Sequence, residues 1–168
     1  MNEFYKEILV KKETTSADVI KKYGLLFLTV AAFVAFILVH PLFIIAAVGL
    51  GVACYFLLPT FDLEYEYLYV NGDIDVDRIM GKQKRKRAGS YNLEEMEIIA
   101  PAGSHELDSY RARGGKVIDY TSGRSDAKCY TAVYMKDGQQ QMVSFEFDQE
   151  VLKDLRRLAP RKVSRECL

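Results

Sequence analysis

A short run of positive charge is the sequence feature with the clearest chemical potential. Five of the six residues from 82 to 87 are basic: Lys82, Lys84, Arg85, Lys86 and Arg87. Such a run could contact anionic lipid headgroups, bind nucleic acid or another partner, or offset the six acids between Asp62 and Asp77. A nucleic-acid reader is usually basic as a whole domain, whereas residues 61–168 include 18 basic and 19 acidic residues. The composition therefore argues against nucleic acid and leaves lipid, a protein partner and internal charge compensation open.

Residues that usually carry out catalysis or hold metals are few. The chain has two histidines, His40 and His105, and neither has a second ligand at the spacing of a metal site. His105, Glu106 and Asp108 resemble part of a hydrolytic site, but no motif supplies a nucleophile. The segment DYTSGRSD, residues 119–126, could cradle a phosphate with turn amides or be an ordinary loop. We therefore predict no enzyme activity, no catalytic residue, no metal ligand and no cofactor.

One segment is too apolar to belong to a water-soluble domain. Residues 24–59 include no Asp, Glu, Lys or Arg, which is typical of membrane-spanning sequence. A single helix over these residues would be about 54 Å long, too long for a hydrocarbon core of about 30 Å. Pro41 disfavours helix in the middle, so we predict two spans, Tyr23–Val39 and Leu42–Leu58. A signal peptide would be shorter and nearer the N-terminus.

The charges around this segment predict its orientation. Lys11, Lys12, Lys21 and Lys22 lie before it and the basic run follows it, whereas the turn between the spans has no Lys or Arg. The positive-inside rule then places both termini in the cytoplasm of a two-span cell-membrane protein. Gly49 and Gly51 of the second span, together with the alanines of both spans, are expected to allow close contact between the two helices. Neither span includes Asp, Glu, Lys or Arg, so transport would require the chain to be one subunit of a larger assembly.

After the apolar segment the hydrophobic pattern takes on the period of a strand. In FDLEYEYLYV, acids alternate with apolar and aromatic residues, which predicts a half-buried strand with Tyr65, Tyr67 and Tyr69 in the core. Asn71-Gly72 is the strongest short signal for a hairpin turn, and DIDVDRIM alternates again. The sequence therefore predicts an antiparallel pair that leaves the apolar segment and returns toward it.

This hairpin has a consequence for the basic run. The end of its second strand should lie beside the start of its first, which would put Lys82 close to the membrane surface. KRKRAGSY is then expected as a third strand. Its Lys84 and Lys86 would reach the acidic face that holds Asp75 and Asp77.

Further short strands and one helix complete the domain. Strands are expected in NLEEMEIIAP, KVIDYTSG, KCYTAVYM and QMVSFEF, the last two joined by a turn at Asp137-Gly138, and the segment AGSHELDSYRARGG is irregular or partly helical. A C-terminal amphipathic helix is predicted at about 148–159, capped by Asp148. Phe4, Ile8 and Leu9 suggest a short N-terminal helix. The three cysteines form no CxxC pair, so no disulfide is predicted.

These motifs resemble a known family. YEYLYVNGDIDVDRIMGKQKRKR, DYTSG and LAPRKV are similar to segments of a family of small uncharacterised proteins from anaerobic Gram-positive bacteria. The order of short strands followed by one helix, all after a two-helix anchor, resembles bacterial membrane proteins with a pleckstrin-homology-like (PH-like) domain. The resemblance implies a partly open antiparallel barrel closed at one end by the C-terminal helix. It supplies no catalytic residue.

Together these features predict an α+β protein with three parts. They are a cytoplasmic N-terminal amphipathic segment (1–22), a transmembrane helical hairpin (23–59) and a cytoplasmic PH-like β domain (60–168). The predicted function is a membrane-anchored module that recruits or regulates a protein partner. The alternatives are docking on anionic lipid through the basic run, and a subunit role in a larger membrane assembly. The sequence does not set the oligomeric state.

Overall fold

The computed structural model describes residues 4–136 and 138–167, which form two compact units. The helical unit consists of Glu13–Glu64 and Ile79–Arg85. The domain consists of the described residues up to Lys12, of Tyr65–Arg78 and of those from Lys86 onward. Along the chain, the boundaries between the two units fall after Lys12, Glu64, Arg78 and Arg85.

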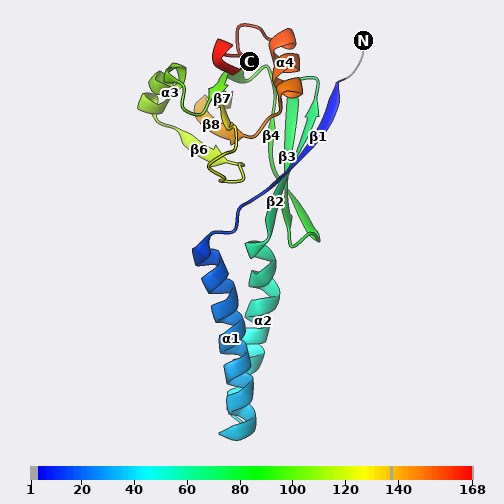
Figure 1. Ribbon diagram of the computed structural model, residues 1–168, viewed down its shortest axis with the longest axis vertical. Coiled ribbons are helices and arrows are strands. Elements are labelled where there is room, and N and C mark those ends of the chain that lie inside the picture. Colours follow the sequence, from blue (N-terminus) through cyan, green and yellow to red (C-terminus); the bar gives the residue numbers. More distant parts are fainter. Residues whose placement is uncertain (1–3, 137, 168) are drawn as a thin grey trace. The chain divides into compact units, whose positions relative to one another are not determined.

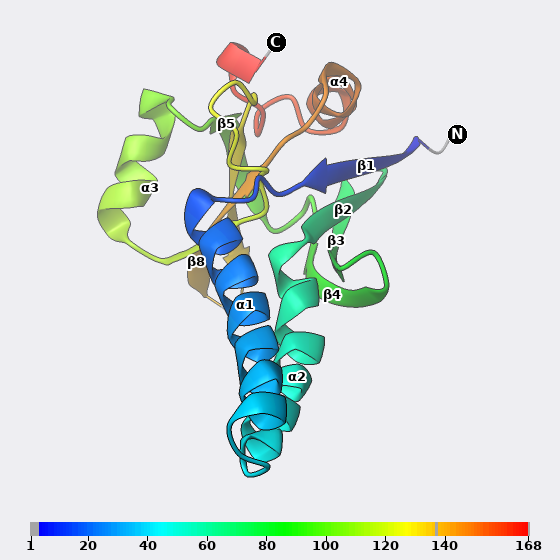
Figure 2. The same cartoon turned by 60° about the horizontal axis from the view of Figure 1, so that its bottom comes forward.

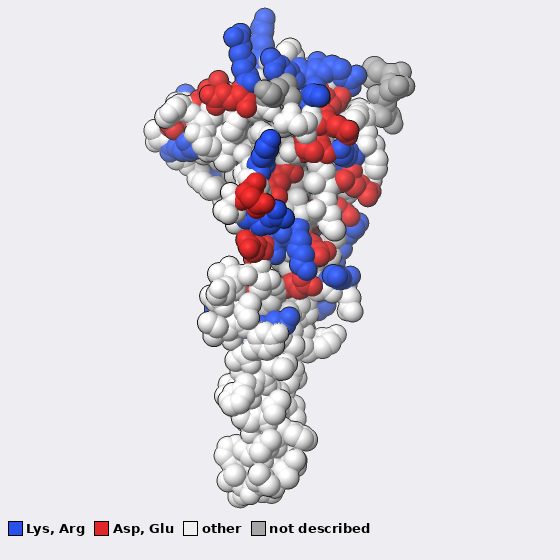
Figure 3. Space-filling model, viewed as in Figure 1, with Lys and Arg blue, Asp and Glu red and all other residues white. Residues whose placement is uncertain are grey.

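The helical unit is built on two apolar helices, α1 (Ser16–Leu38) and α2 (Phe43–Leu57), followed by the short 3₁₀ helix η1 (Leu58–Phe61). The two helices lie side by side in both views (Figures 1 and 2) and are joined by a turn that contains Pro41. Thr29 Oγ1 lies 3.1 Å from Cys54 Sγ across their contact. Ser16–Leu38 and Phe43–Phe61 are long and apolar enough to cross a membrane, and most of their surface is without charge (Figure 3).

The contact between these helices differs in one detail from the sequence prediction. An added Cβ at Gly49 or Gly51 would meet nothing within 4 Å, so the glycines do not form the helix contact. The buried residues of α2 are Ala47 and Cys54, seven residues apart and therefore on one helical face. Thr15 occupies the N-cap position of α1, but its side chain makes no capping hydrogen bond.

The domain begins with a four-stranded sheet in the order β1-β2-β3-β4. Its strands are β1 (Tyr5–Lys11), β2 (Leu63–Val70), β3 (Asp73–Met80) and β4 (Lys84–Tyr91). The predicted hairpin is confirmed, because Asn71 and Gly72 connect β2 to β3 with φ values of 49° and 100°, as a type I′ turn requires. The third predicted strand is confirmed as β4.

The predicted N-terminal helix is wrong, because this segment is the edge strand β1. Its burial alternates from residue to residue, with Val10 buried. Over so few residues, the spacing of Phe4 and Ile8 fits both the helical period of 3.6 and the strand period of 2. Pairing with β2 selects the strand. The Phe4 amide donates to the side-chain Oδ1 of Asn71, and the Asn71 amide donates to the Phe4 carbonyl. These two bonds fix the start of β1 against the hairpin turn.

A second four-stranded sheet has the order β5-β7-β8-β6. It consists of β5 (Met96–Pro101), β6 (Lys116–Asp119), β7 (Tyr130–Lys136) and β8 (Gln139–Phe145). The β7–β8 pair is antiparallel, as predicted, whereas β6 pairs in parallel with β8. Asp137 of the predicted turn lies outside the described residues. In the described part of the chain the strands form two separate sheets without a closed barrel.

Aromatic side chains fill the core of the domain. Tyr65, Tyr67 and Tyr69 are 3%, 0% and 0% exposed, which confirms the predicted inward row. The hydroxyl of Tyr67 donates to the Tyr120 carbonyl at 2.6 Å. Rings from both sheets pack edge to face, including Tyr67 against Phe145 at 5.6 Å. Burial of these rings provides much of the driving force for folding.

The C-terminal helix α4 (Gln149–Leu158) completes the domain and confirms the predicted amphipathic helix. Asp148 caps it by accepting a hydrogen bond from the Val151 amide. Val151, Leu152 and Leu155 are fully buried. Two shorter helical segments, η2 (His105–Leu107) and α3 (Asp108–Arg113), precede β6, and η3 (Arg165–Cys167) follows α4.

Candidate functional site

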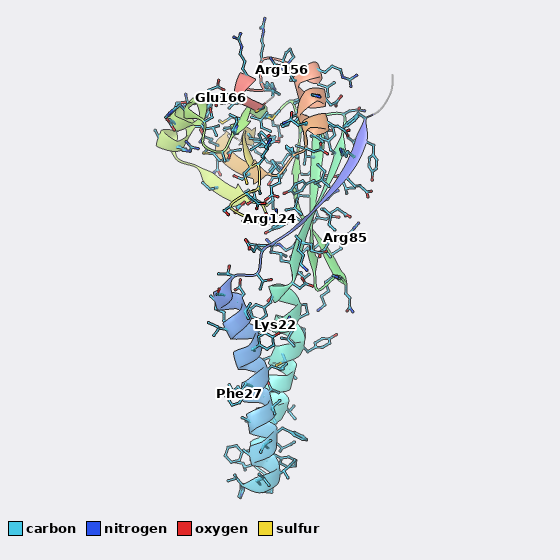
Figure 4. All side chains as sticks on the ribbon, viewed as in Figure 1. Lys22, Phe27, Arg85, Arg124, Arg156 and Glu166 are labelled. Carbon is cyan, nitrogen blue, oxygen red and sulfur yellow. The ribbon has the colours of Figure 1, made fainter. Side chains whose placement is uncertain are left out.

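The basic run does not form one site, because the two units divide it. Lys82, Lys84 and Arg85 belong to the helical unit, whereas Lys86 and Arg87 belong to the domain. Figure 4 shows Arg85 near the end of the first sheet. A strand advances about 3.3 Å per residue, so charges that are neighbours in sequence are spread along β4. We refer to Lys82, Lys84 and Arg85 as the basic turn.

The backbone holds the basic turn against the end of α2. The amide of Gly81 donates to the carbonyl of Asp62 at 2.8 Å. Gly81 and Lys82 both have positive φ, 56° and 57°, a conformation that favours glycine at the first position. A Cβ added to Gly81 would lie only 3.0 Å from Cβ of Pro59. The close packing on Pro59 therefore favours glycine at position 81. It also fixes the position of the backbone from which the side chains of Lys82 and Lys84 extend.

The side chain of Lys84 lies over aromatic rings of α2. Its Nζ is 5.5 Å from the ring centroids of both Tyr55 and Phe56, within the range of a cation–π interaction. The two rings are largely exposed and meet edge to face. The sequence predicted that Lys84 would reach acidic strand residues. The structure gives it an aromatic platform at the end of an apolar helix instead.

The other part of the run lies in the domain. Arg87 forms an ion pair with Asp75, with 2.5 Å between Nη2 and Oδ2. Internal charge compensation thus operates at Asp75, but through Arg87 rather than through the predicted Lys84 and Lys86. Lys86 and Arg87 also line an open groove with Arg78 and residues 116–120. Arg78 stands where the alternation of DIDVDRIM calls for an apolar residue, and this break in the pattern is the signal that could have pointed to the groove; in the structure the side chain is exposed.

The histidine cluster is an ordinary helix-surface arrangement. Nδ1 of His105 lies 3.0 Å from Oδ2 of Asp108, whose other oxygen accepts from Arg111 at 2.7 Å. The hydrogen bond to Asp108 raises the pKa of His105, whose side chain is 99% exposed. No described nucleophile makes a hydrogen bond to this ring. These contacts favour a surface ion pair over a hydrolytic site.

The turn at 119–126 uses its donors within the chain. The amide and the hydroxyl of Ser122 both donate to Oε1 of Glu146 at 2.6 Å. Thr121 donates from its amide and its hydroxyl to Asp119. Arg124, labelled in Figure 4, forms an ion pair with Asp126. Carboxylates of the chain already accept the bonds that a phosphate would need, which favours the ordinary-loop interpretation.

The three cysteines lie in separate parts of the fold, and the pKa of two of them is raised. Within the described ranges, no three His, Cys, Asp or Glu residues are grouped in a way that could hold a metal ion. Burial raises the pKa of Cys167 to about 11, which disfavours the reactive thiolate. Cys129 lies just before β7 and is only partly buried. Burial also raises its pKa.

Comparison with known proteins places the chain in a family. The family model described as a bacterial PH-like domain (DUF6106) matches residues 2–165, so the matched region includes α1 and α2 as well as both sheets. No curated protein and no solved structure matches the chain. PH-like domains are generally binding or scaffolding modules, and the fold alone does not identify what they bind. Because the match extends over nearly the whole sequence, this chain belongs to the bacterial PH-like domain family (DUF6106).

Proposed function

We propose that this protein is a membrane-anchored, non-catalytic binding module in which α1 and α2 span the bilayer. α1, and α2 together with η1, have the length and composition of spans, and 0% and 11% of the residues in their most apolar stretches are buried within the protein. Many apolar side chains of α1 are exposed. Phe27, labelled in Figure 4, is 74% exposed. A water-soluble protein rarely exposes so large an apolar surface, and a bilayer would cover it.

The distribution of charge supports a cytoplasmic location for both termini. Lys21 and Lys22 lie in the first two turns of α1, with Lys22 labelled in Figure 4, and the basic turn packs on Pro59, just after the last residue of α2. Because α1 and α2 run in opposite directions, these groups flank the same end of the helix pair. The connecting turn at 39–42 has no Lys or Arg. The positive-inside rule then puts the connecting turn outside the cell.

The basic turn is proposed to contact anionic lipid headgroups. The observation that carries this proposal is the position of Lys84 Nζ, 5.5 Å from the Tyr55 and Phe56 ring centroids on the last turns of α2. Aromatic residues and lysines typically lie where a span meets the headgroups. Each basic residue near an anionic surface contributes about 1 kcal/mol of attraction. The turn would hold the attached strands of the first sheet at the membrane surface.

Recruitment of a protein partner is the second proposed role. It is supported by the open groove beside Lys86 and Arg87, which lies in the domain and not in the helical unit. The absence of catalysis is part of the same proposal. It is supported by the contacts of His105 and of residues 119–126, which use their polar groups on neighbouring side chains.

The lipid contact is tested with the full chain in nanodiscs of phosphatidylcholine alone or mixed with phosphatidylglycerol. Amide hydrogen exchange of residues 79–85 should slow in the anionic discs. Changing Lys82, Lys84 and Arg85 to Gln should remove this difference. The control changes three exposed basic residues of the domain, Lys153, Arg161 and Arg165, to Gln and should keep it. Equal exchange in both lipids, or a difference that survives the first variant, would refute the contact.

The orientation is tested by labelling single cysteines in cells. In a background lacking the three natural cysteines, His40→Cys should react with a membrane-impermeant maleimide added outside. Lys128→Cys, at an exposed position of the domain, should react only after the membrane is opened. The reverse pattern would overturn the proposed topology, and reaction of both positions in intact cells would overturn the assignment of two spans.

A further inference from the structure

An open groove lies within the domain between the last strands of its two sheets. It has a volume of about 480 Å³ and is lined by residues 116–120 and by Arg78, Lys86, Arg87 and Ala88. β4 is the end strand of the first sheet and β6 is the end strand of the second. The two sheets therefore present their end strands to the same space.

Tyr120 anchors one part of the groove. Its hydroxyl lies 3.2 Å from the Ala88 carbonyl, to which it donates, and 2.9 Å from the Tyr91 hydroxyl. These bonds join the residue after β6 to β4 through a side chain that is only 4% exposed. A Cβ at Gly89 would lie 2.8 Å from the same hydroxyl, so the strand and the ring are in close contact. The groove thus has a fixed, buried tyrosine in its wall.

The charge of the groove is mainly positive. Four cationic side chains line it, namely Arg78, Lys86, Arg87 and Lys116, together with one carboxylate, that of Asp119. Asp119 Oδ1 already accepts from the amide and hydroxyl of Thr121. Arg87 is shared with Asp75. The remaining positive charge comes from both sides of the groove and favours an acidic ligand.

The backbone of β6 adds hydrogen-bonding groups to this charge. In the parallel β6–β8 pair the amide of Tyr120 donates to the Ser144 carbonyl. Successive residues of a strand alternate in direction, so Ile118 also faces β8, and the backbone groups of Val117 and Asp119 face away from it. Val117 is 73% exposed. The outward N–H and C=O groups of an end strand are a template for an added strand.

We infer that this groove binds an extended acidic segment of a partner protein, which adds as a strand to β6 while its carboxylates meet Arg78, Lys86 and Lys116. A strand-shaped ligand fits the observations better than a compact headgroup. The cations are spread over three strands, β3, β4 and β6, and Val117 offers an exposed apolar side chain beside the outward backbone groups of β6. This inference rests on the proposed role as a binding module and specifies its partner.

Binding is tested with the full chain in neutral detergent micelles at about 0.15 M salt, where surface charges are screened beyond about 8 Å. The probe is a fluorescein-labelled peptide of about eight residues, a typical strand length, that alternates Glu with Val. The comparison peptide alternates Gln with Val. We expect fluorescence anisotropy to rise on titration with the first peptide and to rise much less with the second. Equal binding of both peptides, or of neither, would overturn the inference.

Matched variants locate the binding site. Changing Lys86 and Lys116 to Glu should weaken binding of the acidic peptide by at least about tenfold, because like charges then face each other. Lys128→Glu, an exposed change outside the groove, should alter it less than about twofold, as expected for a peripheral charge. Changing Lys86 and Lys116 to Arg should preserve binding. Loss of binding in the Arg variant, or the same loss in the Lys128 control, would contradict a site in the groove.

A backbone change separates strand addition from simple charge attraction. Val117→Pro removes an outward N–H from an end strand, a position where proline is compatible with the β6–β8 ladder. It should reduce peptide binding while far-UV circular dichroism and thermal unfolding stay those of the parent chain. Unchanged peptide binding would overturn strand addition. If glycerophosphoinositol displaces the peptide and anionic vesicles bind the groove in its place, the groove is a headgroup site and the inference is wrong.

The two proposals fail independently. The groove experiment uses no anionic lipid and leaves Lys82, Lys84 and Arg85 unchanged. The nanodisc experiment uses no peptide and leaves Lys86 and Lys116 unchanged. Loss of the lipid effect with retained peptide binding would therefore remove only the lipid contact, and the reverse result would remove only the groove.

Discussion

The two parts of the basic run differ in almost everything except charge. Lys84 lies over exposed aromatic rings at the end of an apolar helix, whereas Arg87 is paired with Asp75 beside an open groove. The first is held by a tight backbone contact at Gly81, and the second by the pairing of β3 with β4. Five basic residues in six positions therefore belong to two candidate surfaces. Charge density in a sequence does not define a site until the strand that carries it is placed.

The largest effect is expected from breaking the contact that positions the basic turn. Gly81→Ala puts a side chain at φ 56° and 3.0 Å from Cβ of Pro59. The left-handed conformation alone costs a residue other than glycine about 1–2 kcal/mol, and displacement of Pro59 adds to this. The opening free energy of residues 79–85, measured by amide hydrogen exchange, should fall by at least this amount.

The matched control for this change is Gly103→Ala. A Cβ there meets nothing within 4 Å, so stability should change by less than about 0.5 kcal/mol. Peptide binding in the groove should be the same in both variants. A similar loss in both variants would show that the close approach at Pro59 is not what holds the turn.

Removing the aromatic rings under Lys84 should lower the opening free energy of residues 79–85 by less than Gly81→Ala does. Changing Tyr55 and Phe56 together to Leu keeps apolar volume on α2 but removes the rings 5.5 Å from Nζ. Cation–π contacts at exposed sites contribute about 0.5–1 kcal/mol. A double-mutant cycle with Lys84→Met, measured by exchange of residues 79–85, should show a coupling of this size. Strict additivity would mean that Lys84 is positioned by the strand alone.

Sequence patterns predicted the parts of the fold that depend on interactions between residues close together in the chain, such as strand alternation, turns and helix caps. The alternation in β2 identified the buried row of Tyr65, Tyr67 and Tyr69, because a strand with one face in a core must repeat every two residues. Asn71-Gly72 identified the turn, because both positions need positive φ. The face of α4 and its cap at Asp148 were equally visible.

The features that sequence patterns missed depend on contacts between distant segments. β1 becomes a strand only through pairing with β2, some sixty residues away in the chain. The groove exists because β6 pairs in parallel with β8, a partner that no short motif specifies. Gly49 and Gly51 matched a general rule for helix contacts, but the rotation of α2 puts Ala47 and Cys54 against α1. In each case the geometry follows from tertiary pairing.

The ion pair between Arg87 and Asp75 should contribute less to the free energy of unfolding than the contact at Gly81 does, and its contribution should depend on salt. Arg87 and Asp75 have side chains that are 62% and 34% exposed. Surface pairs of this kind contribute about 0.2–1 kcal/mol. A cycle of Arg87→Gln and Asp75→Asn, measured by chemical denaturation, should give a coupling in this range that shrinks as salt is added. A coupling unaffected by salt would indicate a buried contact, contrary to the observed exposure.

The smallest effect is expected from pH, and it should distinguish the domain from the helical unit. Burial would raise the pKa of Asp148, but hydrogen bonds from Lys6 and from the Val151 amide hold it below its ordinary value. The pKa of Lys6 is raised by its bonds to Asp148 and Glu150. These groups tie β1 to the start of α4, with Lys6 Nζ 2.6 Å from Glu150 Oε2.

A depressed carboxyl pKa has a defined sign for stability. The contribution of Asp148 is present above the pKa of an unfolded Asp, about 3.9, and is lost as pH falls through its lower folded value. Because this side chain is 42% exposed, solvent screening keeps the effect small. Acidification below about pH 4 should therefore lower the protection factors of amides in β1 and the first turn of α4, relative to intrinsic exchange at the same pH, before those of the rest of the domain. Asp148→Asn retains a capping side chain but lacks the charge, so it should remove this acid-dependent step. An unchanged step in that variant would assign the acid response to another carboxylate.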